Sequence, residues 1–460
     1  MHLSAGLEVL TQHRFTLHVH NPPFPRVLTA LPPWLAGARF EGSGDLIEEM
    51  KVKFYSTGHY KTMLALARAP TLFFFLLGAL ATWAWARRET DDTTALLALF
   101  FFTTQPAILG HSGLATVDTA ATAGMAVALF AFSRWLTRPD WIRAAILGAA
   151  WGFSINCKLL CIAYVPLACA AIYIVRMLRD AQTRAQWRKI VTVLAVPPVA
   201  VAVVWIGYGF SLHQFITGVT DMMAVNEAMY EGYAFGQWRA GGWWWYFPLT
   251  VALKTTLATL LITIAGFFLV RKNGVFLETI AAAAAVLALS MTTHVDVGLR
   301  YVLPIYVPLS IAMAIAALAM IRHRQKLLRV AAMLLLSWHF IASTIAHPDY
   351  LAYFNEIALP DPSRYLVDSN LDWGQDILRL RNEVRRRKID HLGVSLFGPA
   401  DLTRLGFPPH NYVDSETPTQ GWIAVSDSAY RWGTPYGGWR WLDRKKCDRI
   451  GKSIRLCYVE

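Results

Sequence analysis

Apolar stretches that are long enough to cross the hydrocarbon layer of a membrane recur along this chain from residue 63 to residue 346. A helix needs about 20 apolar residues to span that layer. Stretches that reach or approach this length lie at residues 63–86, 94–109, 115–136, 143–157, 160–176, 190–210, 246–270, 276–292, 302–320 and 328–346. We therefore predict an α-helical polytopic membrane protein with about ten membrane segments, of which the shorter ones are tilted, broken or buried among their neighbours.

The composition agrees with membrane insertion. Of the 460 residues, 55% are hydrophobic and 16% are charged, and the mean hydropathy is +0.36. A soluble domain carries about 25% charged residues, so the excess of apolar side chains has to face lipid. The formal net charge of +12 does not indicate a nucleic-acid partner, because most Lys and Arg residues lie in short loops between the apolar stretches, as membrane topology requires.

The basic residues are concentrated in alternate loops, and this pattern predicts the orientation of the chain. Cytoplasmic loops of membrane proteins carry an excess of Lys and Arg. The loops that we expect in the cytoplasm contain Arg87 and Arg88; Arg134, Arg138 and Arg143; Arg176, Arg179, Arg184, Arg188 and Lys189; Arg271 and Lys272; and Arg322, Arg324, Lys326 and Arg329. The opposite loops should face outward.

These outward loops carry aromatic residues instead. Trp243, Trp244, Trp245, Tyr246 and Phe247 follow one another at a predicted membrane boundary. Because Trp and Tyr are enriched at the depth of the lipid head groups, we interpret this run as an interfacial belt on the outer face.

The orientation divides the chain into three predicted parts. Residues 1–58 are the remnant of a first outer loop, residues 59–346 form the transmembrane domain, and residues 347–460 form a small soluble α/β domain on the outer face. Within the last part, we predict a basic helix at Trp373–Lys388 with Asp372 as its N-cap, and strands at His391–Phe397, Gly421–Ser426 and Ser453–Val459.

An outward N-terminal segment needs something to export it. Residues 1–58 contain neither the apolar core of a signal peptide nor a spanning helix. We expect that a transmembrane helix precedes Met1 and is missing from the chain as given. The alternative is that the first membrane segment is translocated unaided.

The cysteines fall into two groups. Cys157, Cys161 and Cys169 lie inside apolar helices, and none of the cysteines is part of a C-x-x-C pair, which excludes a zinc pattern and a disulfide framework. Cys447 and Cys457 flank a predicted strand–turn–strand near the C-terminus. They can form a disulfide if that end lies outside the cytoplasm, and otherwise they remain thiols.

Ionisable residues inside membrane segments are costly and are therefore candidates for function. Asp118 begins a helix after His111, Lys158 lies between two short apolar helices, Lys254 lies within a long apolar run, and His294, Asp296 and Arg300 share one loop. All of them fall at outward helix ends. Structural alternatives exist for each: Asp118 as a charge favoured at a helix N-terminus, Lys254 as a residue that extends to the head groups, and the others as ordinary loop residues.

Cations and a carboxylate on one face suit the chemistry of a lipid phosphate that is attacked by a hydroxyl group. Arg or Lys stabilises the negative charge that develops on the leaving phosphate, and a carboxylate accepts the proton of the nucleophile. A transporter for such a lipid could use similar residues. It would also carry polar residues at the bilayer midplane, often within an internal repeat, and the sequence shows no repeat.

The motifs of this chain, taken in order, resemble those of the polyprenyl-phosphate-sugar-dependent glycosyltransferases of the GT-C fold, which include protein O-mannosyltransferases and lipid A aminoarabinose transferases. The resemblance covers nearly the whole chain. It rests on Leu7–Leu10, Asn21–Arg26, Arg68–Pro70, Leu114–Asp118, Gly152–Lys158, Trp244–Pro248 with Lys254 and Thr255, Gly298–Pro304, His347–Tyr350 and Asp368–Asp376.

The resemblance implies an inverting transfer on the outer face, in which the acceptor attacks the anomeric carbon and the polyprenyl phosphate leaves. It implies a catalytic role for Asp118, which matches the second acidic position of the family, and a donor-phosphate role for Lys158, Arg300, His111 and Lys254. The family's first acidic residue, in the first outer loop, would precede Met1. Where the family often has His before the Pro-Pro pair, this chain has Asn21, with His20 adjacent.

We therefore predict a glycosyltransferase of the hexosyl or mannosyl type in a bacterial inner membrane. Its partners would be a polyprenyl-phosphate sugar donor, a lipid, glycan or protein acceptor, and membrane lipids. A lipid-linked sugar transporter or flippase, and a noncatalytic accessory or degenerate subunit, are the alternatives. No cofactor is required by the motifs; a divalent cation stays open, because one carboxylate and scattered histidines do not form a usual ligand set.

Overall fold

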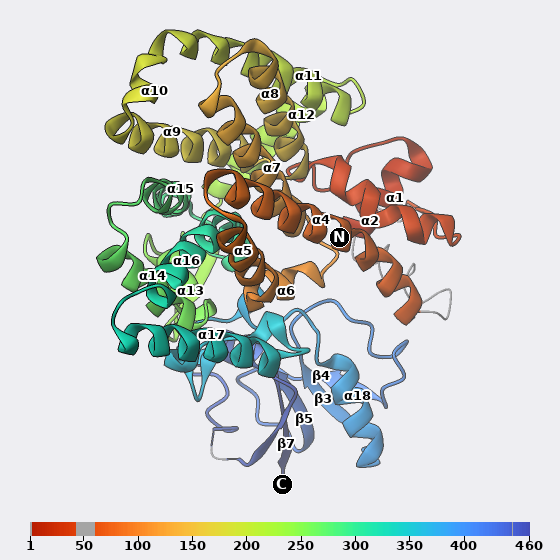
Figure 1. The fold of residues 1–460 in the computed structure, drawn as a ribbon. Helices are drawn as coiled ribbons and strands as arrows, with labels where there is room; N and C mark the ends of the chain where they lie inside the picture. Colours follow the sequence, from red (N-terminus) through yellow and green to blue (C-terminus); the bar gives the residue numbers. More distant parts are fainter. Residues whose placement is uncertain (1, 43–59, 444) are drawn as a thin grey trace. The chain divides into compact units, whose positions relative to one another are not determined.

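The computed structural model describes residues 2–42, 60–443 and 445–460 (Figure 1). The part of the predicted first outer loop at residues 43–58 lies outside the described residues. The described residues divide into two compact units. Unit 1 lies within Met1–Glu227, Thr255–Thr292 and Tyr301–Ile345, and unit 2 lies within Ala228–Lys254, Thr293–Arg300 and Ala346–Glu460.

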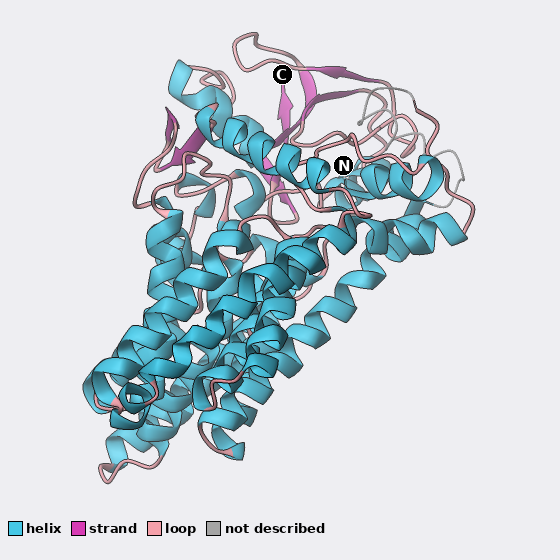
Figure 2. Ribbon diagram, turned by 90° about the horizontal axis from the view of Figure 1, so that it is seen from above, coloured by secondary structure: helices cyan, strands magenta, loops and turns pink. Residues whose placement is uncertain are grey.

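Unit 1 is a bundle of helices, which run alongside one another in Figure 2. Short apolar N-terminal helices precede the long ones. The helices are α1 (His2–Gln12), α2 (Pro23–Leu35), α4 (Tyr60–Glu89), α5 (Asp92–Thr104), α6 (Pro106–Ser112), α7 (Asp118–Thr137), α8 (Trp141–Cys157), α9 (Cys161–Arg179), α10 (Ala181–Ala185), η1 (Trp187–Ala195), α11 (Val196–Gly207), α12 (Leu212–Glu227), α14 (Leu257–Leu269), α15 (Gly274–Ser290), η3 (Leu303–Ile305), α16 (Tyr306–Ile321) and α17 (Lys326–Ala346).

The structure confirms a polytopic helical membrane protein. Among the described residues, six helices are long and apolar enough to cross a membrane, or up to eight if each of two bent helix pairs is one span. Each of the ten predicted segments coincides with a helix or a bent pair, but α8 and α15 have only 17 residues each. The predicted number of about ten is therefore approximate, because apolar runs of this length also form shorter helices inside a bundle.

The burial of the helices shows which of them form the core of unit 1. In the apolar stretch of α7, 83% of the residues are buried, and the same share is buried in Leu303–Ile321, which contains α16. In the apolar stretch of α17 only 17% of the residues are buried. Leu327 and Ile345, at the two ends of α17, are exposed. Hydrophobic side chains that no protein atom covers are expected to face lipid tails in a membrane.

Close packing in the bundle depends on small residues. On α8, Gly148 and Gly152 face α11, and a Cβ atom at either position would lie 2.6 Å from a backbone oxygen of that helix, at Val196 and Ala200. Two glycines spaced four residues apart allow helix backbones to approach within a membrane. They hold α8, which carries Lys158 at its end, against its neighbour.

Unit 2 contains all the strands of the described residues, drawn in magenta in Figure 2. A hairpin of β1 (Glu231–Ala234) and β2 (Gln237–Ala240) precedes α13 (Tyr246–Lys254). The C-terminal sheet has the order β4-β3-β5-β7-β6 and is made of β3 (Leu392–Ser395), β4 (His410–Tyr412), β5 (Gly421–Ser426), β6 (Cys447–Ile450) and β7 (Ile454–Val459). Helices α18 (Ile377–Arg386) and α19 (Asp427–Gly433) accompany it, which confirms the small α/β domain.

The three predicted strands are confirmed as β3, β5 and β7, but the predicted start of the basic helix is wrong. Helix α18 begins at Ile377 and not at Trp373. Gly374 has φ +74°, a left-handed conformation that interrupts a helix. Asp372 accepts a hydrogen bond from the Gly374 N–H at 2.8 Å, so its side chain stabilises a turn before the helix and is not the N-cap.

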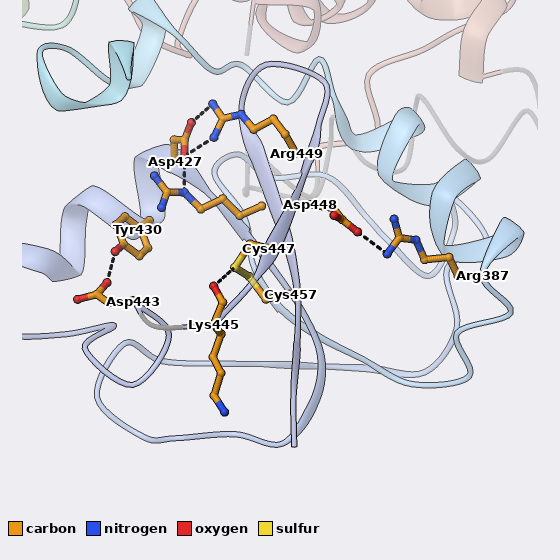
Figure 3. The surroundings of a disulfide bond; sticks show 10 residues. Arg387, Asp427, Tyr430, Asp443, Lys445, Cys447, Asp448, Arg449 and Cys457 are labelled. Carbon is orange, nitrogen blue, oxygen red and sulfur yellow. Dashed lines mark hydrogen bonds and ion pairs between the residues drawn. A yellow bond between two sulfur atoms is a disulfide. The ribbon is translucent and has the colours of Figure 1, made fainter. Parts of the chain in front are cut away.

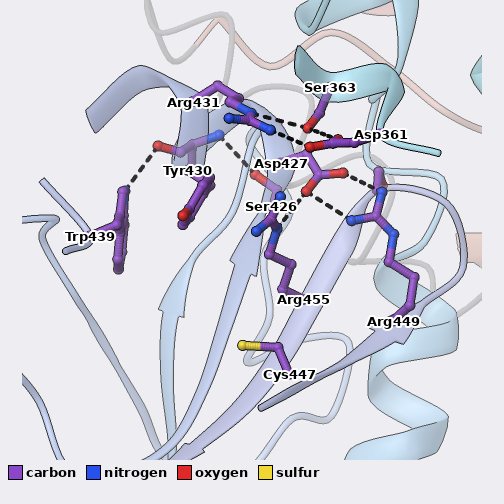
Figure 4. Close-up of polar contacts among 12 residues, drawn as sticks. Asp361, Ser363, Ser426, Asp427, Tyr430, Arg431, Trp439, Cys447, Arg449 and Arg455 are labelled. Atoms are coloured by element: carbon purple, nitrogen blue, oxygen red, sulfur yellow. Dashed lines mark hydrogen bonds and ion pairs between the residues drawn. The ribbon is translucent and has the colours of Figure 1, made fainter. Parts of the chain in front are cut away.

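A disulfide between Cys447 and Cys457 joins β6 to β7 (Figure 3). These are the strands of the predicted strand–turn–strand, which is confirmed. In the same sheet, Asp427 at the start of α19 is buried and accepts hydrogen bonds from Arg449 of β6 and Arg455 of β7 (Figure 4). A buried carboxylate is stable when it is paired in this way, so the C-terminal strands are fixed both covalently and electrostatically.

The predicted aromatic belt is only partly exposed. Trp244 is 66% exposed, but Tyr246 and Phe247 are buried inside unit 2. Asp296 accepts a hydrogen bond from the Trp243 N–H at 2.6 Å, and the Tyr246 hydroxyl accepts one from Asn370 at 2.9 Å. These bonds fold the aromatic run back into the protein, so interpreting Tyr246 and Phe247 as interfacial residues was wrong.

Candidate functional site

Asp118 and Lys158 meet inside unit 1. Asp118 is the first residue of α7, and Lys158 follows the last residue of α8 in an extended conformation. The Lys158 Nζ atom lies 2.6 Å from Asp118 Oδ1, and only 11% and 3% of the two side chains are exposed. The two residues are 40 positions apart in sequence, and the packing of α7 against α8 brings them together.

The position of each residue has a local cause. A carboxylate at the first turn of a helix is favoured by the helix dipole, so Asp118 is tolerated where α7 begins. Lys158 lies where α8 ends, and its backbone N–H donates to the Ser154 carbonyl as the last bond of that helix. The next helix, α9, begins at Cys161. The interruption between two short apolar helices, visible in the sequence, therefore places an ammonium group in the bundle.

Tyr301 completes the surroundings of this ammonium group. The Lys158 Nζ atom lies 4.6 Å from the centre of the Tyr301 ring, within the range of a cation–π interaction. A carboxylate on one element and an aromatic face on another fix the charge in place. A phosphate group is negatively charged, as Asp118 is, so the Lys158 ammonium group is already positioned for a charge-assisted hydrogen bond with a phosphate.

Arg300, the neighbour of Tyr301 in sequence, belongs to unit 2, where its guanidinium carbon lies 5.1 Å above the Trp373 ring. Asp368 lies close enough for its pKa to respond: burial raises the pKa of this carboxyl, and the charge of Arg300 lowers it in part. Unit 2 thus presents a second cation beside an aromatic ring and a carboxyl group.

Asn370 organises the loop that carries Arg300, and sequence reasoning did not single it out. Its side-chain carbonyl accepts from the Leu299 N–H at 3.0 Å, and its amide donates to the Tyr246 hydroxyl at 2.9 Å. Ser369, next to it, donates to the Val297 carbonyl. The only signal in the sequence was the polar run Asp368–Asp376, which was recognised as a motif but without a role for each residue.

Lys254 is fully enclosed in unit 2. Its ammonium group donates to the backbone carbonyls of Leu351 at 2.7 Å and Asn370 at 2.5 Å, and it lies 4.2 Å from the centre of the Phe354 ring. With 3% of the residue exposed, Lys254 does not extend to lipid head groups. The structure uses its charge to satisfy two carbonyl groups.

The remaining candidates differ in burial. His111 lies in the last turn of α6 and is buried, and its part in phosphate binding stays a prediction. His294 is exposed. Asp296 is buried in the loop that follows α15, where it accepts a hydrogen bond from the Trp243 N–H, and burial raises its pKa to about 7.

The N-terminal motif forms a compact turn in unit 1. Glu8 accepts from the backbone N–H groups of Thr16 and Leu17, and Arg26 donates to the carbonyls of Leu17 and His18. Burial lowers the pKa of Arg26 to about 10. His20, which stands beside the unusual Asn21, contacts Asp221 with 2.7 Å between Nδ1 and Oδ2.

The described residues, 2–42, 60–443 and 445–460, also bear on metal binding. Among those residues, no group of three or more His, Cys, Asp or Glu side chains could hold a metal ion. The arrangement described above is therefore one of cations, carboxylates and aromatic rings.

These features define a polytopic membrane protein with a buried carboxylate–ammonium pair between helix ends. Residues 10–216 match the model of the family described as dolichyl-phosphate-mannose-protein mannosyltransferase. The match covers slightly less than half of the chain and includes both Asp118 and Lys158. It confirms the resemblance to the GT-C-fold glycosyltransferases that the motifs indicated. A search of the curated proteins found no match.

Solved structures of two proteins, one of them in two states, are similar to this chain. ArnT from Cupriavidus metallidurans in the apo state has 14% identity and a TM-score of 0.49, with 99% of this chain and 92% of that chain covered. The same protein bound to undecaprenyl phosphate has 14% identity and a TM-score of 0.47 over the same shares of 99% and 92%. The Archaeoglobus fulgidus oligosaccharyltransferase tethered with an acceptor peptide has 13% identity and a TM-score of 0.45, with 87% and 59% covered.

Proposed function

We propose that this protein is a glycosyltransferase that moves a sugar from a polyprenyl-phosphate donor to a hydroxyl acceptor on the outer face of the membrane. The observation that carries the proposal is the buried Asp118–Lys158 pair, which lies in the region that matches the mannosyltransferase family. A charged pair inside a membrane bundle is costly, and it is retained where function needs it.

The chemistry that we assign is an inverting displacement. The acceptor oxygen attacks the anomeric carbon, the bond from that carbon to the phosphate oxygen breaks, and polyprenyl phosphate leaves with the bonding electrons. Asp118 accepts the proton of the acceptor hydroxyl. Lys158 stabilises the negative charge on the leaving phosphate, in a site from which water is largely excluded.

The other candidates take supporting roles in this proposal. For Arg300 and His111 we propose roles in binding the donor phosphate, as the resemblance implies. Lys254 already donates to the carbonyls of Leu351 and Asn370, so we propose that it holds the loop of Asn370 in place instead of binding the phosphate directly. We propose a hexose such as mannose as the sugar, in line with the family description.

Transfer from a radiolabelled polyprenyl-phosphate sugar tests the proposal. Lys158→Ala and Arg300→Ala should each reduce the labelled product of purified protein by at least about 100-fold, since each removes a cation from the leaving group. Lys326→Ala, which changes an exposed lysine at the start of α17, serves as the matched control. Unchanged transfer in both active-site variants would contradict the proposal, and movement of intact donor across vesicles without bond cleavage would favour a transporter.

The outward orientation is part of the proposal and has its own test. The basic loops predict it, and the Cys447–Cys457 disulfide supports it, because disulfides persist in oxidising compartments. After mild reduction of intact spheroplasts, a membrane-impermeant maleimide should label Cys447, which is partly exposed. Cys157, buried in α8, should remain unlabelled. Labelling only after the membrane is permeabilised would place this end of the chain in the cytoplasm.

A further inference from the structure

A cavity of about 560 Å³ opens at one end of the C-terminal sheet in unit 2. It lies where β3 and β5 begin and where β7 ends, beside the turn that follows α18. Its volume falls in the range of about 300–1,000 Å³ that is typical of small-molecule sites. Nothing in the proposed transfer chemistry uses it.

Two aromatic rings form one wall of this cavity. Trp422 of β5 and Tyr458 of β7 are directly paired across the two strands, and their ring centroids lie 5.2 Å apart. Tyr458 is 52% exposed. The guanidinium carbon of Arg387 lies 5.3 Å from the centre of the Trp422 ring and fixes this ring. The two rings are tilted by 57° to each other and both reach solvent, so they form a bent aromatic wall. The core lies on the other side of the sheet, around Ile423 and Cys457.

Polar groups surround the aromatic wall. Asp390, Lys388 and Gln420 line the cavity and are exposed. His391 and Asn411, also in the lining, contact each other with 2.8 Å between Nε2 and Oδ1. The rim thus combines carboxylate and amide acceptors with ammonium and amide donors. Lys388 follows α18 and has φ +53°, a conformation that is uncommon for a residue with a side chain. The chain turns toward the cavity at this position.

We infer that this cavity binds a neutral glycan, with a pyranose ring against Trp422 and Tyr458. A pyranose presents an apolar face of C–H groups, which suits an aromatic ring, and an edge of hydroxyl groups that each donate and accept hydrogen bonds. A mixture of donors and acceptors satisfies such an edge, whereas an anionic ligand would need an excess of cations. An apolar ligand would leave the polar rim unpaired.

The inference narrows the acceptor of the proposed reaction. A site for sugar rings on the soluble domain would hold a glycan acceptor, and this assignment of its role rests on the proposed function. Binding of the glycan itself does not rest on the proposed function, because it requires neither the donor lipid nor the Asp118–Lys158 pair. The two claims can therefore fail separately.

Saturation-transfer difference NMR on the full-length protein in detergent tests the inference by measuring the binding of two probes, mannotriose and cellotriose. No donor lipid is present. We expect saturation transfer from the protein to at least one of the two trisaccharides, and a loss of at least about fivefold in affinity for Tyr458→Ala and Trp422→Ala. Loss of one aromatic ring from a stacking site costs about 1–3 kcal/mol when a base is the ligand, and a sugar ring should lose a comparable fraction of its affinity.

The matched control is Tyr412→Ala, since Tyr412 is a 77% exposed tyrosine of β4 in the same sheet and is not part of the cavity lining. Gln420→Ala keeps the inference testable if Trp422→Ala does not fold, because Gln420 is an exposed rim residue. Absence of saturation transfer to both probes, or equal binding by the Tyr458→Ala and Tyr412→Ala proteins, would overturn the inference. Normal binding without any sugar transfer would leave it standing and contradict the proposed function.

Discussion

Lys158→Met is expected to destabilise the protein by about 3–5 kcal/mol, because it removes the ammonium group that pairs with the buried Asp118 carboxylate. The same substitution should lower sugar transfer by at least about 100-fold. Asp118→Asn should also lose transfer, since an amide does not accept the proton of the acceptor hydroxyl. Thermal unfolding in detergent gives the first quantity, and the radiolabelled transfer assay gives the second.

The double variant Asp118→Asn/Lys158→Met separates a structural role from a catalytic one. It removes both charges, so no unpaired ion remains, and replacing a buried ion pair with uncharged groups is often neutral or stabilising. Its stability should return to within about 1 kcal/mol of the unchanged protein, while its transfer should stay as low as that of the single variants. Recovery of transfer together with stability would show that the pair is only a structural bridge.

Arg87 and Asp92 provide the matched control for this cycle. They form an ion pair with 2.6 Å between Nε and Oδ1, as short as the buried pair, but 54% and 73% of their side chains are exposed. Exposed pairs contribute about 0–1 kcal/mol. The variants Arg87→Met and Asp92→Asn should therefore change neither transfer nor the unfolding temperature appreciably. The comparison isolates burial as the cause of the larger effect.

Hydrophobic length and charge in the loops were sufficient to predict the membrane bundle. The apolar run that became α7 and the one that became α16 were located within a few residues of their observed ends. Burial of each helix was not predictable, because α7 and α17 are both apolar and only their packing distinguishes a core helix from one that faces lipid. The segments that became α8 and α15, with 17 residues each, were likewise predicted from apolar length alone.

The candidate site was predictable residue by residue but not as contacts. Asp118 and Lys158 were singled out because a charge inside an apolar run is rare, yet nothing in the sequence says that they touch. Asn370 was missed because its role comes from three separate segments that meet in the fold. The start of α18 was misplaced because Asp372 was interpreted as an N-cap, whereas Gly374 forms a turn that needs φ +74°.

Lys254→Met should lower the stability of unit 2. The effect should stay local to that unit, in contrast to Lys158→Met, which removes the ammonium group beside a buried carboxylate. The Lys254 ammonium group donates to the carbonyls of Leu351 and Asn370, and methionine leaves both buried carbonyls without this donor. Each unsatisfied buried group costs about 1–3 kcal/mol, and the desolvation that methionine no longer requires offsets a part. We expect a net loss of about 2–4 kcal/mol.

Hydrogen exchange with mass spectrometry locates this effect. In the Lys254→Met protein, exchange should accelerate in the segments that contain Leu351 and Asn370, because those segments lose their shared anchor. Lys452→Met, which changes an exposed lysine of the same unit, should leave the exchange pattern unchanged. If Lys254 bound the donor phosphate directly, its substitution would weaken donor binding while exchange around Asn370 stayed normal. Faster exchange at Asn370 together with reduced transfer would instead trace the loss of activity to the displaced Arg300 loop, which Asn370 holds through the Leu299 N–H.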